Sequence, residues 1–492
     1  MKLYFYGHSY KYAAEQMMLS LYPAERPEYP EGKPEGDRVE LRLSRGKVYT
    51  TAVCRLVRGG KAFTAKSAVK TEQMTDDIMR DKLCSRIIKT AFYRAAIASG
   101  HESPAWGMLT GVRPGKLFRE ELRGVSDATA VRRFMRDYDV SEQRALLCRD
   151  TALVTENVAA GLGERDVCLY VGIPFCPTRC SYCSFVSQSV EKSMKLIPPF
   201  MDALMQEIDA AVKIIHELSL SVISIYMGGG TPTTLSPKQL DRLCSRLEEQ
   251  FDLSKVREYT VEAGRPDTIS EDKLRVLRAH GVDRISVNPQ TMSDEVLAVI
   301  GRKHTSQDII DALEKVRRVG GMAVNMDLIA GLPSDTVEGF TQTLDRVIAL
   351  EPENITVHTL SLKKGSRITL EGSPLPSDED VGRMLTVSQE KLRGGGWAPY
   401  YLYRQKFMSG GFENIGWAKP DSINLYNVCI MEELCSIIAL GGGGSTKLVS
   451  AGTGRNIRLF APKYPSEYIS GILKTCTDKQ GIIDFYSKEN QS

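Results

Sequence analysis

The most constraining feature of the sequence is a unit that recurs six times between about residues 165 and 380. Each unit is a short, apolar, β-branched run that ends in a Gly, Pro or polar cluster and is followed by a stretch with helical periodicity. Such a series predicts parallel strands joined by right-handed crossovers. We therefore expect an α/β fold, a partial (β/α)6 barrel of the TIM type, with its functional residues at the carboxyl ends of the strands.

The elements of this series can be read directly from the sequence. The expected strands are CLYVGIPF, VISIYMGGG, EYTVEAGR, RISVNPQ, AVNMDLIAGLP and NITVHTLSL. Helical patterns between these strands cover residues 199–218, 237–250, 271–280, 306–319 and 337–350. The strands and helices therefore alternate along the whole series.

Two regions with other residue patterns flank the series. In residues 1–163 the alternating segment VELRLSRGKVYTTAVCRLV predicts antiparallel strands with a turn at Arg45–Gly46. Helical patterns follow at 76–99 and 128–162, and the segment GMLTGVRPGK between them is expected to be a loop. Residues 381–492 begin with a helical pattern, become rich in Gly and aromatic residues, and carry a helical segment near 431–439. We therefore expect three domains: an α+β N-terminal domain of unknown role (1–163), the partial barrel (164–380) and a small C-terminal domain (381–492).

The bulk composition excludes several classes of protein. A chain of 492 residues is too long for one ordinary hydrophobic core, and its net charge of +3 carries no signature of nucleic-acid binding. No apolar run approaches the roughly 18 residues of a membrane span, and the N-terminus lacks the apolar core of a signal peptide. We expect a cytoplasmic protein, whose 11 cysteines are thiols or metal ligands rather than disulfides.

Three cysteines follow the first expected strand of the series. Cys176, Cys180 and Cys183 form a CxxxCxxC pattern, which should arise by chance about 0.005 times in a chain of this composition. Three thiolates in one short loop can hold three corners of a cubane cluster and leave the fourth iron open to a small molecule. The alternative is a zinc site, which would want a fourth Cys or His, and Cys168 on the preceding strand need not reach the loop.

This motif, with Tyr182 before its last cysteine, resembles the hallmark of the radical S-adenosylmethionine (SAM) enzymes. The resemblance implies an oxidoreductase with a [4Fe–4S] cluster on Cys176, Cys180 and Cys183, and SAM on the open iron. In that family an electron from the cluster cleaves SAM to methionine and a 5′-deoxyadenosyl radical, which abstracts a substrate hydrogen. The residue that would act directly on the substrate stays unassigned.

Polar residues and glycines at the other strand ends fit the same family pattern. Glycines in GGGTPT let the backbone approach a ligand closely, Arg302 could pair with a SAM carboxylate, and Asp327 could accept hydrogen bonds from ribose hydroxyls. By resemblance, the cluster-bound SAM would contact Tyr170, Gly229 and Glu262. A second SAM, which members of one branch hold beside the first, would contact Tyr182, Gly230, Thr231, Gln290, Arg302 and Asp327.

That branch is the oxygen-independent coproporphyrinogen oxidase branch, which the order YVGIPFC, GGGTPT, E, Q, GRxH, NxDLIxGLP resembles over residues 165–380. The flanking segments TGVRPGK, PYYLYRQK and ENIGWAKP are similar to its coproporphyrinogen dehydrogenase (HemZ) variant, so the C-terminal domain would be of the HemN/HemW type. The implied reaction is the oxidative decarboxylation of coproporphyrinogen III to protoporphyrinogen IX in haem synthesis. SAM would be the oxidant, and flavodoxin or ferredoxin the electron donor.

The sequence departs from the branch at two places. The oxidase has a Cys two residues after its last cluster Cys, where this chain has Phe185. The His-Asn-x-x-Tyr-Trp element of haem-chaperone members is replaced by Tyr426-Asn427-Val-Cys, which argues against a haem carrier. Three alternatives therefore stay open: a radical SAM methyltransferase or modifying enzyme of another small molecule, a haem-binding chaperone, and a zinc-stabilised scaffold.

Two further groups of residues are candidates for binding. Coproporphyrinogen carries four carboxylates, so its pocket needs Arg or Lys beside an apolar cavity, and Arg404, Lys406 and Lys419 lie among aromatic residues. Cys429 and Cys435 could suggest an auxiliary cluster, although two thiols of this spacing on a helical pattern are more often packing residues.

Overall fold

The computed structural model describes residues 1–111, 113–183, 188–189, 193–361, 368, 374–405, 409–450 and 456–489. The chain forms two compact units, Met1–Arg149 and Asp150–Ser492. The expected domain boundaries near residues 163 and 380 stay predictions.

The first unit is built on a four-stranded sheet. Its strands are β1 (Lys2–Tyr6), β2 (Arg38–Arg45), β3 (Tyr49–Arg58) and β4 (Lys61–Lys70), in the order β1-β2-β3-β4. Strand β1 is parallel to β2, and the other pairs are antiparallel. The expected turn at Arg45–Gly46 is present, because the Gly46 N–H donates to the Tyr49 carbonyl at 2.9 Å.

The helices of this unit follow local signals, with two differences from expectation. They are α1 (Lys11–Leu21), α2 (Asp77–Ala98), α3 (Pro114–Leu122) and α4 (Asp127–Tyr138), and α5 (Glu142–Ala160) crosses the boundary between the units. The segment expected to be a loop ends inside α3, because proline at the first position of a helix is already preset for it. The pattern at 128–162 is split into α4 and α5, since Asp139 adopts a left-handed backbone with φ of 53°.

The expected series of parallel strands forms the core of the second unit. Its members are β5 (Asp166–Ile173), β8 (Ser221–Gly229), β9 (Glu258–Glu262), β10 (Arg284–Ser286), β11 (Ala323–Ala330) and β12 (Asn354–Thr359). Each pairs in parallel with the next in sequence order. Within the described residues these strands form an open sheet rather than a closed barrel, so the expected α/β fold with a partial barrel is confirmed.

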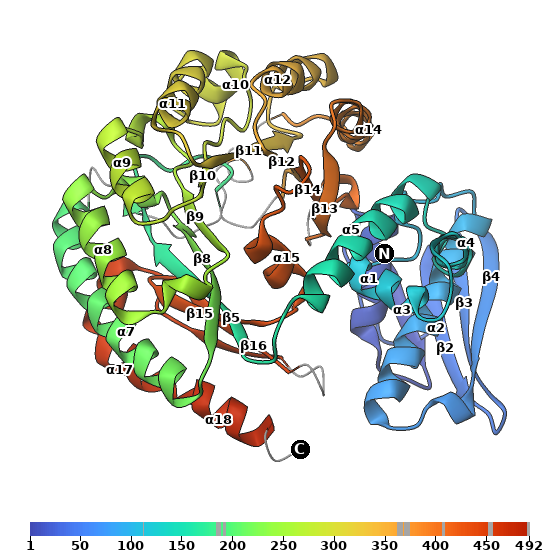
Figure 1. Cartoon of the computed structure of the whole chain (residues 1–492). Helices are drawn as coiled ribbons and strands as arrows, with labels where there is room; N and C mark the ends of the chain where they lie inside the picture. Colours follow the sequence, from blue (N-terminus) through green and yellow to red (C-terminus); the bar gives the residue numbers. More distant parts are fainter. Residues whose placement is uncertain are drawn as a thin grey trace. The chain divides into compact units, whose positions relative to one another are not determined.

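Helices connect these strands and lie on the outer side of the sheet (Figure 1). They are α7 (Ile197–Glu217), α8 (Pro237–Gln250), α9 (Glu271–Ala279), α10 (Asp294–Val299), α11 (Ser306–Val319) and α12 (Val337–Ala349). Capping boxes, Ser236 with Gln239 and Thr305 with Asp308, begin α8 and α11, and this local chemistry explains why their bounds agree with the sequence patterns. The short helix α10 was not expected.

The C-terminal region extends the sheet at both ends. Beyond β12, and after helix α14 (Asp378–Gly394), lie the antiparallel strands β14 (Asn414–Ala418) and β13 (Ala398–Tyr403). Beyond β5 lies β15 (Ser436–Gly441), which is parallel to β5, followed by the antiparallel strands β16 (Ser445–Val449) and β17 (Asn456–Phe460).

The expected helical segment near residues 431–439 is therefore wrong. Helix α15 (Leu425–Glu432) ends where Glu433 adopts a left-handed backbone with φ of 56°, and β15 begins at Ser436. Every residue of β15 is buried, so the run has no polar face to reveal whether its period is that of a helix or a strand. The segment forms a strand because its backbone hydrogen-bonds to β5.

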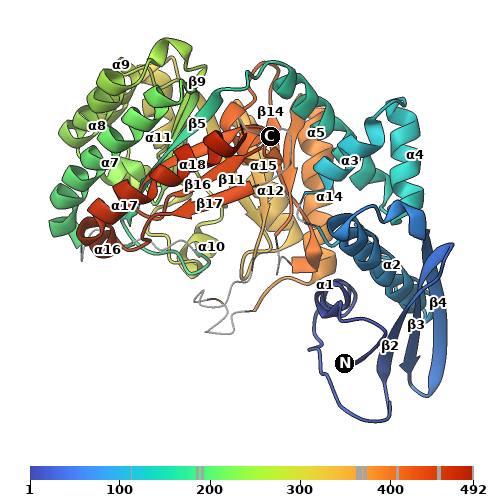
Figure 2. The same ribbon diagram turned by 90° about the horizontal axis from the view of Figure 1, so that it is seen from below.

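The chain ends in three short helices, α16 (Pro465–Ser470), α17 (Ile472–Asp478) and α18 (Gln480–Glu489), which pack along α7 (Figure 2). A buried ion pair anchors them, with the Lys479 ammonium 2.9 Å from the Glu207 carboxylate. The Tyr468 hydroxyl donates to the same carboxylate. None of the helices in the described ranges has the length and apolar character that a membrane span requires.

Candidate active site

A cavity of about 580 Å³ opens at the carboxyl ends of the parallel strands. All twelve residues that the sequence predicts to hold a cluster or SAM line it: Cys176, Cys180, Cys183, Tyr170, Tyr182, Gly229, Gly230, Thr231, Glu262, Gln290, Arg302 and Asp327. They come from seven segments between β5 and β11. The fold thus brings together residues that lie up to 157 positions apart in the sequence.

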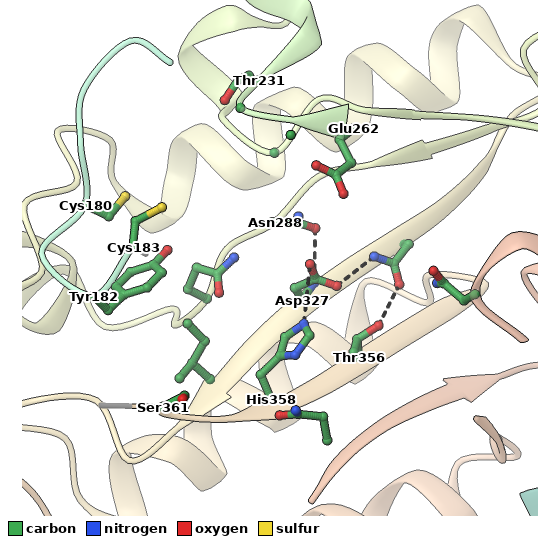
Figure 3. A pocket seen from close by; sticks show the side chains of 18 of the residues that line it. Cys180, Tyr182, Cys183, Thr231, Glu262, Asn288, Asp327, Thr356, His358 and Ser361 are labelled. Atoms are coloured by element: carbon green, nitrogen blue, oxygen red, sulfur yellow. Dashed lines mark hydrogen bonds and ion pairs between the residues drawn. The ribbon is translucent and has the colours of Figure 1, made fainter. Parts of the chain in front are cut away.

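The three cysteines lie on the loop that follows β5. This loop begins with the short strand β6 (Phe175–Cys176), and its turn is held by the Ser181 N–H, which donates to the Ile300 carbonyl at 3.0 Å. Cys180 and Cys183 are neighbours at the cavity wall in Figure 3. Phe185, at the position of the oxidase cysteine, lies outside the described residues.

Two buried arginines lie beside this loop. The Arg265 guanidinium is 3.8 Å from the Cys180 sulfur and donates to the Thr178 hydroxyl at 3.0 Å, while Arg302 donates to the Tyr182 hydroxyl at 3.2 Å. Burial raises the pKa of Cys180, but the charges of Arg302 and Arg265 outweigh it, so this pKa lies below that of an ordinary thiol. The loop is therefore suited to thiolates.

Arg265 was missed by the sequence reasoning. Its side chain is only 3% exposed, and a buried Arg normally has an anionic or hydrogen-bonded partner. The one signal was its place three residues after Glu262, the last residue of β9, in the segment EAGRP.

The glycines at the end of β8 pack closely against neighbouring backbone. Gly229 has φ of +100°, and a β-carbon on Gly230 would lie 2.5 Å from the Phe175 carbonyl oxygen. The Gly230 N–H donates to the Ile173 carbonyl at 2.8 Å and the Thr231 N–H to the Phe175 carbonyl at 2.7 Å. The backbone of this turn is therefore tied to the segment that leads into the cysteine loop, and only glycine fits there.

Two carboxylates face the cavity in different surroundings. Burial raises the pKa of Glu262 to about 7, although its hydrogen bond from the Tyr226 hydroxyl at 2.6 Å acts the other way. Burial also raises the pKa of Asp327, but His358, whose Nε2 lies 3.7 Å from the carboxylate, and a hydrogen bond from the Asn325 amide at 2.8 Å outweigh it and hold the pKa below the usual value. The network around Asp327 is drawn in Figure 3. At neutral pH, Asp327 is ionised while Glu262 can exchange a proton.

Gln290 is held in the cavity wall by an unusual backbone. Its φ is +67°, in a region that few residues other than glycine adopt. Its N–H donates to the Asp327 carbonyl at 2.9 Å, and its own carbonyl accepts from the Ile329 N–H at 3.0 Å. These two bonds to β11 offset the backbone strain and keep Gln290 in place.

Aromatic rings form a second wall of the cavity. Tyr170, Tyr226 and Tyr426 stack on one another, with ring centroids 4.5 Å apart for Tyr226 and Tyr426 and 6.2 Å apart for Tyr170 and Tyr426. Tyr401 and Tyr403 of β13 stack in the same cavity. Apart from Tyr170, these rings were not predicted, because they come from different elements and gave no common motif.

The structure does not bring Arg404 or Lys419, two of the predicted substrate cations, to this wall. The Arg404 guanidinium donates to the Gly411 carbonyl at 3.0 and 2.6 Å, and Arg404 is not among the described residues that line the cavity. Lys419 lies over the Trp397 ring at 4.8 Å, and Lys406 falls outside the described residues. The basic side chains of the described wall are those of Arg179, Arg265, Arg302 and His358.

The donor set fits an anionic cluster with a SAM molecule. Three thiols share one loop, and the glycine turn lines the same cavity. Within the described part of the chain, Nη2 of Arg265 and Nε of Arg302 are buried without a hydrogen-bond partner. A bound anionic group would supply the acceptor that these two N–H groups lack.

Comparison with known proteins agrees with this site. Residues 170–347 match the Radical SAM superfamily. Over 371 residues, 74% of either chain, the sequence is 38% identical to the oxygen-independent coproporphyrinogen-III oxidase-like protein HemZ of Bacillus subtilis (strain 168). It is 36% identical over 233 residues to the oxygen-independent coproporphyrinogen III oxidase of Salmonella typhimurium, covering 46% of this chain and 49% of that one.

Two further likenesses are more distant. The heme chaperone HemW of Bacillus subtilis is 30% identical over 253 residues, which cover 50% of this chain and 64% of that one. The fold is similar to that of coproporphyrinogen III oxidase (HemN) from Escherichia coli, with a TM-score of 0.51, 24% identity, and coverage of 66% of this chain and 73% of that one.

Proposed function

The chain belongs to the oxygen-independent coproporphyrinogen-III oxidase-like family of radical SAM enzymes, and on this premise we propose that it converts coproporphyrinogen III to protoporphyrinogen IX. The observation that carries the proposal is one cavity that combines the three-cysteine loop, the glycine turn and a wall of stacked tyrosines. A tetrapyrrole needs such an apolar face, and its carboxylates need the arginines beside it.

We assign the cofactors to the residues that face the cavity. Cys176, Cys180 and Cys183 would hold a [4Fe–4S] cluster, and Tyr170, the glycine turn and Glu262 would contact the SAM bound to it. When bound, the cluster and SAM would supply the oxidation: each of the two propionates that react would lose carbon dioxide and the equivalent of a hydride, which would pass to SAM and give methionine and 5′-deoxyadenosine.

A second SAM would lie against the remaining strand ends. Arg302 offers a cation for a carboxylate, and Asp327 offers an ionised acceptor for hydroxyl groups. Tyr182, Gly230, Thr231 and Gln290 complete this side of the cavity.

The substrate would lie against the tyrosine wall. The faces of Tyr170, Tyr226 and Tyr426 exclude water from one side of the cavity and can pack on pyrrole rings. For the propionates we propose Arg179 and His358, which line the cavity. Arg404 stays a candidate at the rim, because its neighbours Tyr403 and Gln405 line the cavity, and Lys406 follows in the same segment.

We further propose a small electron-transfer protein, flavodoxin or ferredoxin, as the reductant, and the cytoplasm as the location. A cytoplasmic setting keeps thiols reduced, as the cysteine loop requires.

The test is an anaerobic assay of the reconstituted protein with dithionite, SAM and coproporphyrinogen III, followed by mass spectrometry of the products. We expect loss of two carboxyl groups per porphyrinogen, and Cys180→Ala should abolish it. Formation of 5′-deoxyadenosine without a decarboxylated product would move the search to another substrate, as for a methyltransferase. Stoichiometric haem binding without SAM cleavage would indicate a chaperone instead.

A further inference from the structure

Three cysteines that the proposed reaction does not use meet in the interior of the second unit. Cys168 lies on β5, Cys429 lies on α15, and Cys435 directly precedes β15. Cys168 and Cys429 are 0% exposed and Cys435 is 8% exposed. Cys168 is more than 250 residues from the other two in the sequence but is their neighbour in the fold, because β15 pairs with β5 (Figure 1).

The local backbone directs the three sulfur atoms to one point. Helix α15 ends after Cys429, and the left-handed backbone of Glu433 reverses the direction of the chain. A hydrogen bond stabilises this turn, in which the Leu434 N–H donates to the Cys429 carbonyl at 3.1 Å. Cys435 thus returns toward Cys429. The Sγ atoms of Cys168 and Cys435 are 3.7 Å apart, and all three Sγ atoms lie within 4.8 Å of one another.

Packing alone does not require this arrangement. A buried cysteine often acts as a small hydrophobic residue, and the three thiols do lie in an apolar cluster with Ile223, Ile437 and Tyr426. Packing of that kind would need only that the side chains fill space. Here the most polarisable atom of each of the three side chains faces the other two.

The spacing selects the kind of ligand. A tetrahedral Zn²⁺ ion with Zn–S bonds of about 2.3 Å places its sulfur ligands about 3.8 Å apart. A cubane cluster attaches each thiolate to a different iron, which spreads the sulfur atoms farther than they are here. No histidine or carboxylate of the described residues joins the group, so every donor atom in it is a thiolate sulfur, a soft ligand.

We propose that Cys168, Cys429 and Cys435 bind one thiophilic d¹⁰ cation, Zn²⁺ or Cu⁺, in a site separate from the radical SAM cavity. The bound ion would link α15 and the start of β15 to β5. Tyr426 lies one helical turn before Cys429 and lines the cavity, so the same link would position one ring of the tyrosine wall. The site does not depend on the proposed reaction.

Metal analysis of the full chain tests the site without any assay of activity. The protein is made anaerobically in zinc-supplemented and in copper-supplemented cultures, desalted, and its metals are quantified by mass spectrometry. A second preparation carries Cys176→Ala, Cys180→Ala and Cys183→Ala together, which removes the iron of the cysteine loop. We expect about one equivalent of zinc or copper in both preparations, and the culture that gives it identifies the ion.

Matched variants locate the metal. Cys429→Ser and Cys168→Ser should each lower its content at least tenfold, whereas Cys244→Ser, which changes a buried cysteine elsewhere in the same unit, should leave it unchanged. X-ray absorption at the metal edge of the unmodified protein should show a shell of three sulfur atoms, at about 2.3 Å for zinc. This readout does not require any variant to fold.

Several outcomes would overturn the proposal. They are a chain without zinc or copper, a metal shell of nitrogen and oxygen, and a metal content that survives in folded Cys429→Ser. A disulfide among the three cysteines, detected as a mass two units low before reduction, would also exclude the site.

Discussion

A methyl group at Gly230 should disable the cysteine loop while the rest of the fold survives. The β-carbon of Gly230→Ala would lie 2.5 Å from the Phe175 oxygen and 2.7 Å from the Ile173 oxygen, about 0.9 and 0.7 Å inside ordinary contact. Both atoms are backbone, so no side chain can rotate away. Overpacking of this kind costs about 1–3 kcal/mol, and the two hydrogen bonds of the turn are worth about 1 kcal/mol each. We expect a loss of about 3 kcal/mol in the free energy of unfolding.

The effect on activity should exceed the effect on stability. Relief of the clash moves the segment before Cys176 by about 1 Å, and a displacement of that size typically costs about 100-fold in rate. The assay measures iron content and the rate of 5′-deoxyadenosine formation, together with urea denaturation of the cluster-free protein. Gly394→Ala is the control, since its β-carbon meets nothing within 4 Å. A Gly230→Ala enzyme with full iron content and a rate within twofold of the parent would refute the reasoning.

The pKa of Glu262 is raised by burial from 4.5 to about 7, so the folded state of the cofactor-free protein holds a proton that the unfolded chain releases, and its stability should fall as the pH rises between these values. Glu262→Gln should remove about 3 kcal/mol of this fall between pH 4.5 and 8 in urea denaturation, and an unchanged pH dependence would contradict the assignment. Glu207→Gln leaves the ammonium of Lys479 buried without a charged partner and should cost about 3 kcal/mol of unfolding free energy, whereas Glu217→Gln on the exposed side of the same helix should cost less than 1. Tyr426→Ala removes two stacked contacts and should raise the KM for coproporphyrinogen about tenfold, while Tyr426→Phe should stay within threefold; equal effects of the two would point to the hydroxyl instead.

Local signals explain the elements that were predicted correctly. Capping boxes set the starts of α8 and α11, and the alternation of β-rich runs with helical stretches set the order of β5 through β12. These signals lie within a few residues of the structure that they determine, so no knowledge of distant contacts is needed.

The prediction of a helix that included residues 436–439 was wrong for the opposite reason, because no local signal distinguishes helix from strand there. Ser-Ile-Ile-Ala-Leu-Gly is buried on all sides, and its period carries no information about helix or strand. It became a strand because β5 offers an unpaired edge on which its backbone groups find partners.

The sequence by itself determined which reactive groups the site contains: three thiols in one loop, a glycine-rich turn, and the strand ends that carry Glu262, Gln290 and Asp327. Only the tertiary structure decided which groups surround them. The burial of Arg265 beside Cys180, the stacking of Tyr426 on Tyr170, and the meeting of the three remote cysteines all depend on contacts between residues far apart in the chain. A motif records only the spacing of residues along the backbone. Burial, charge and coordination depend on distances in space, and these are set when the strands of the sheet pair in one particular order.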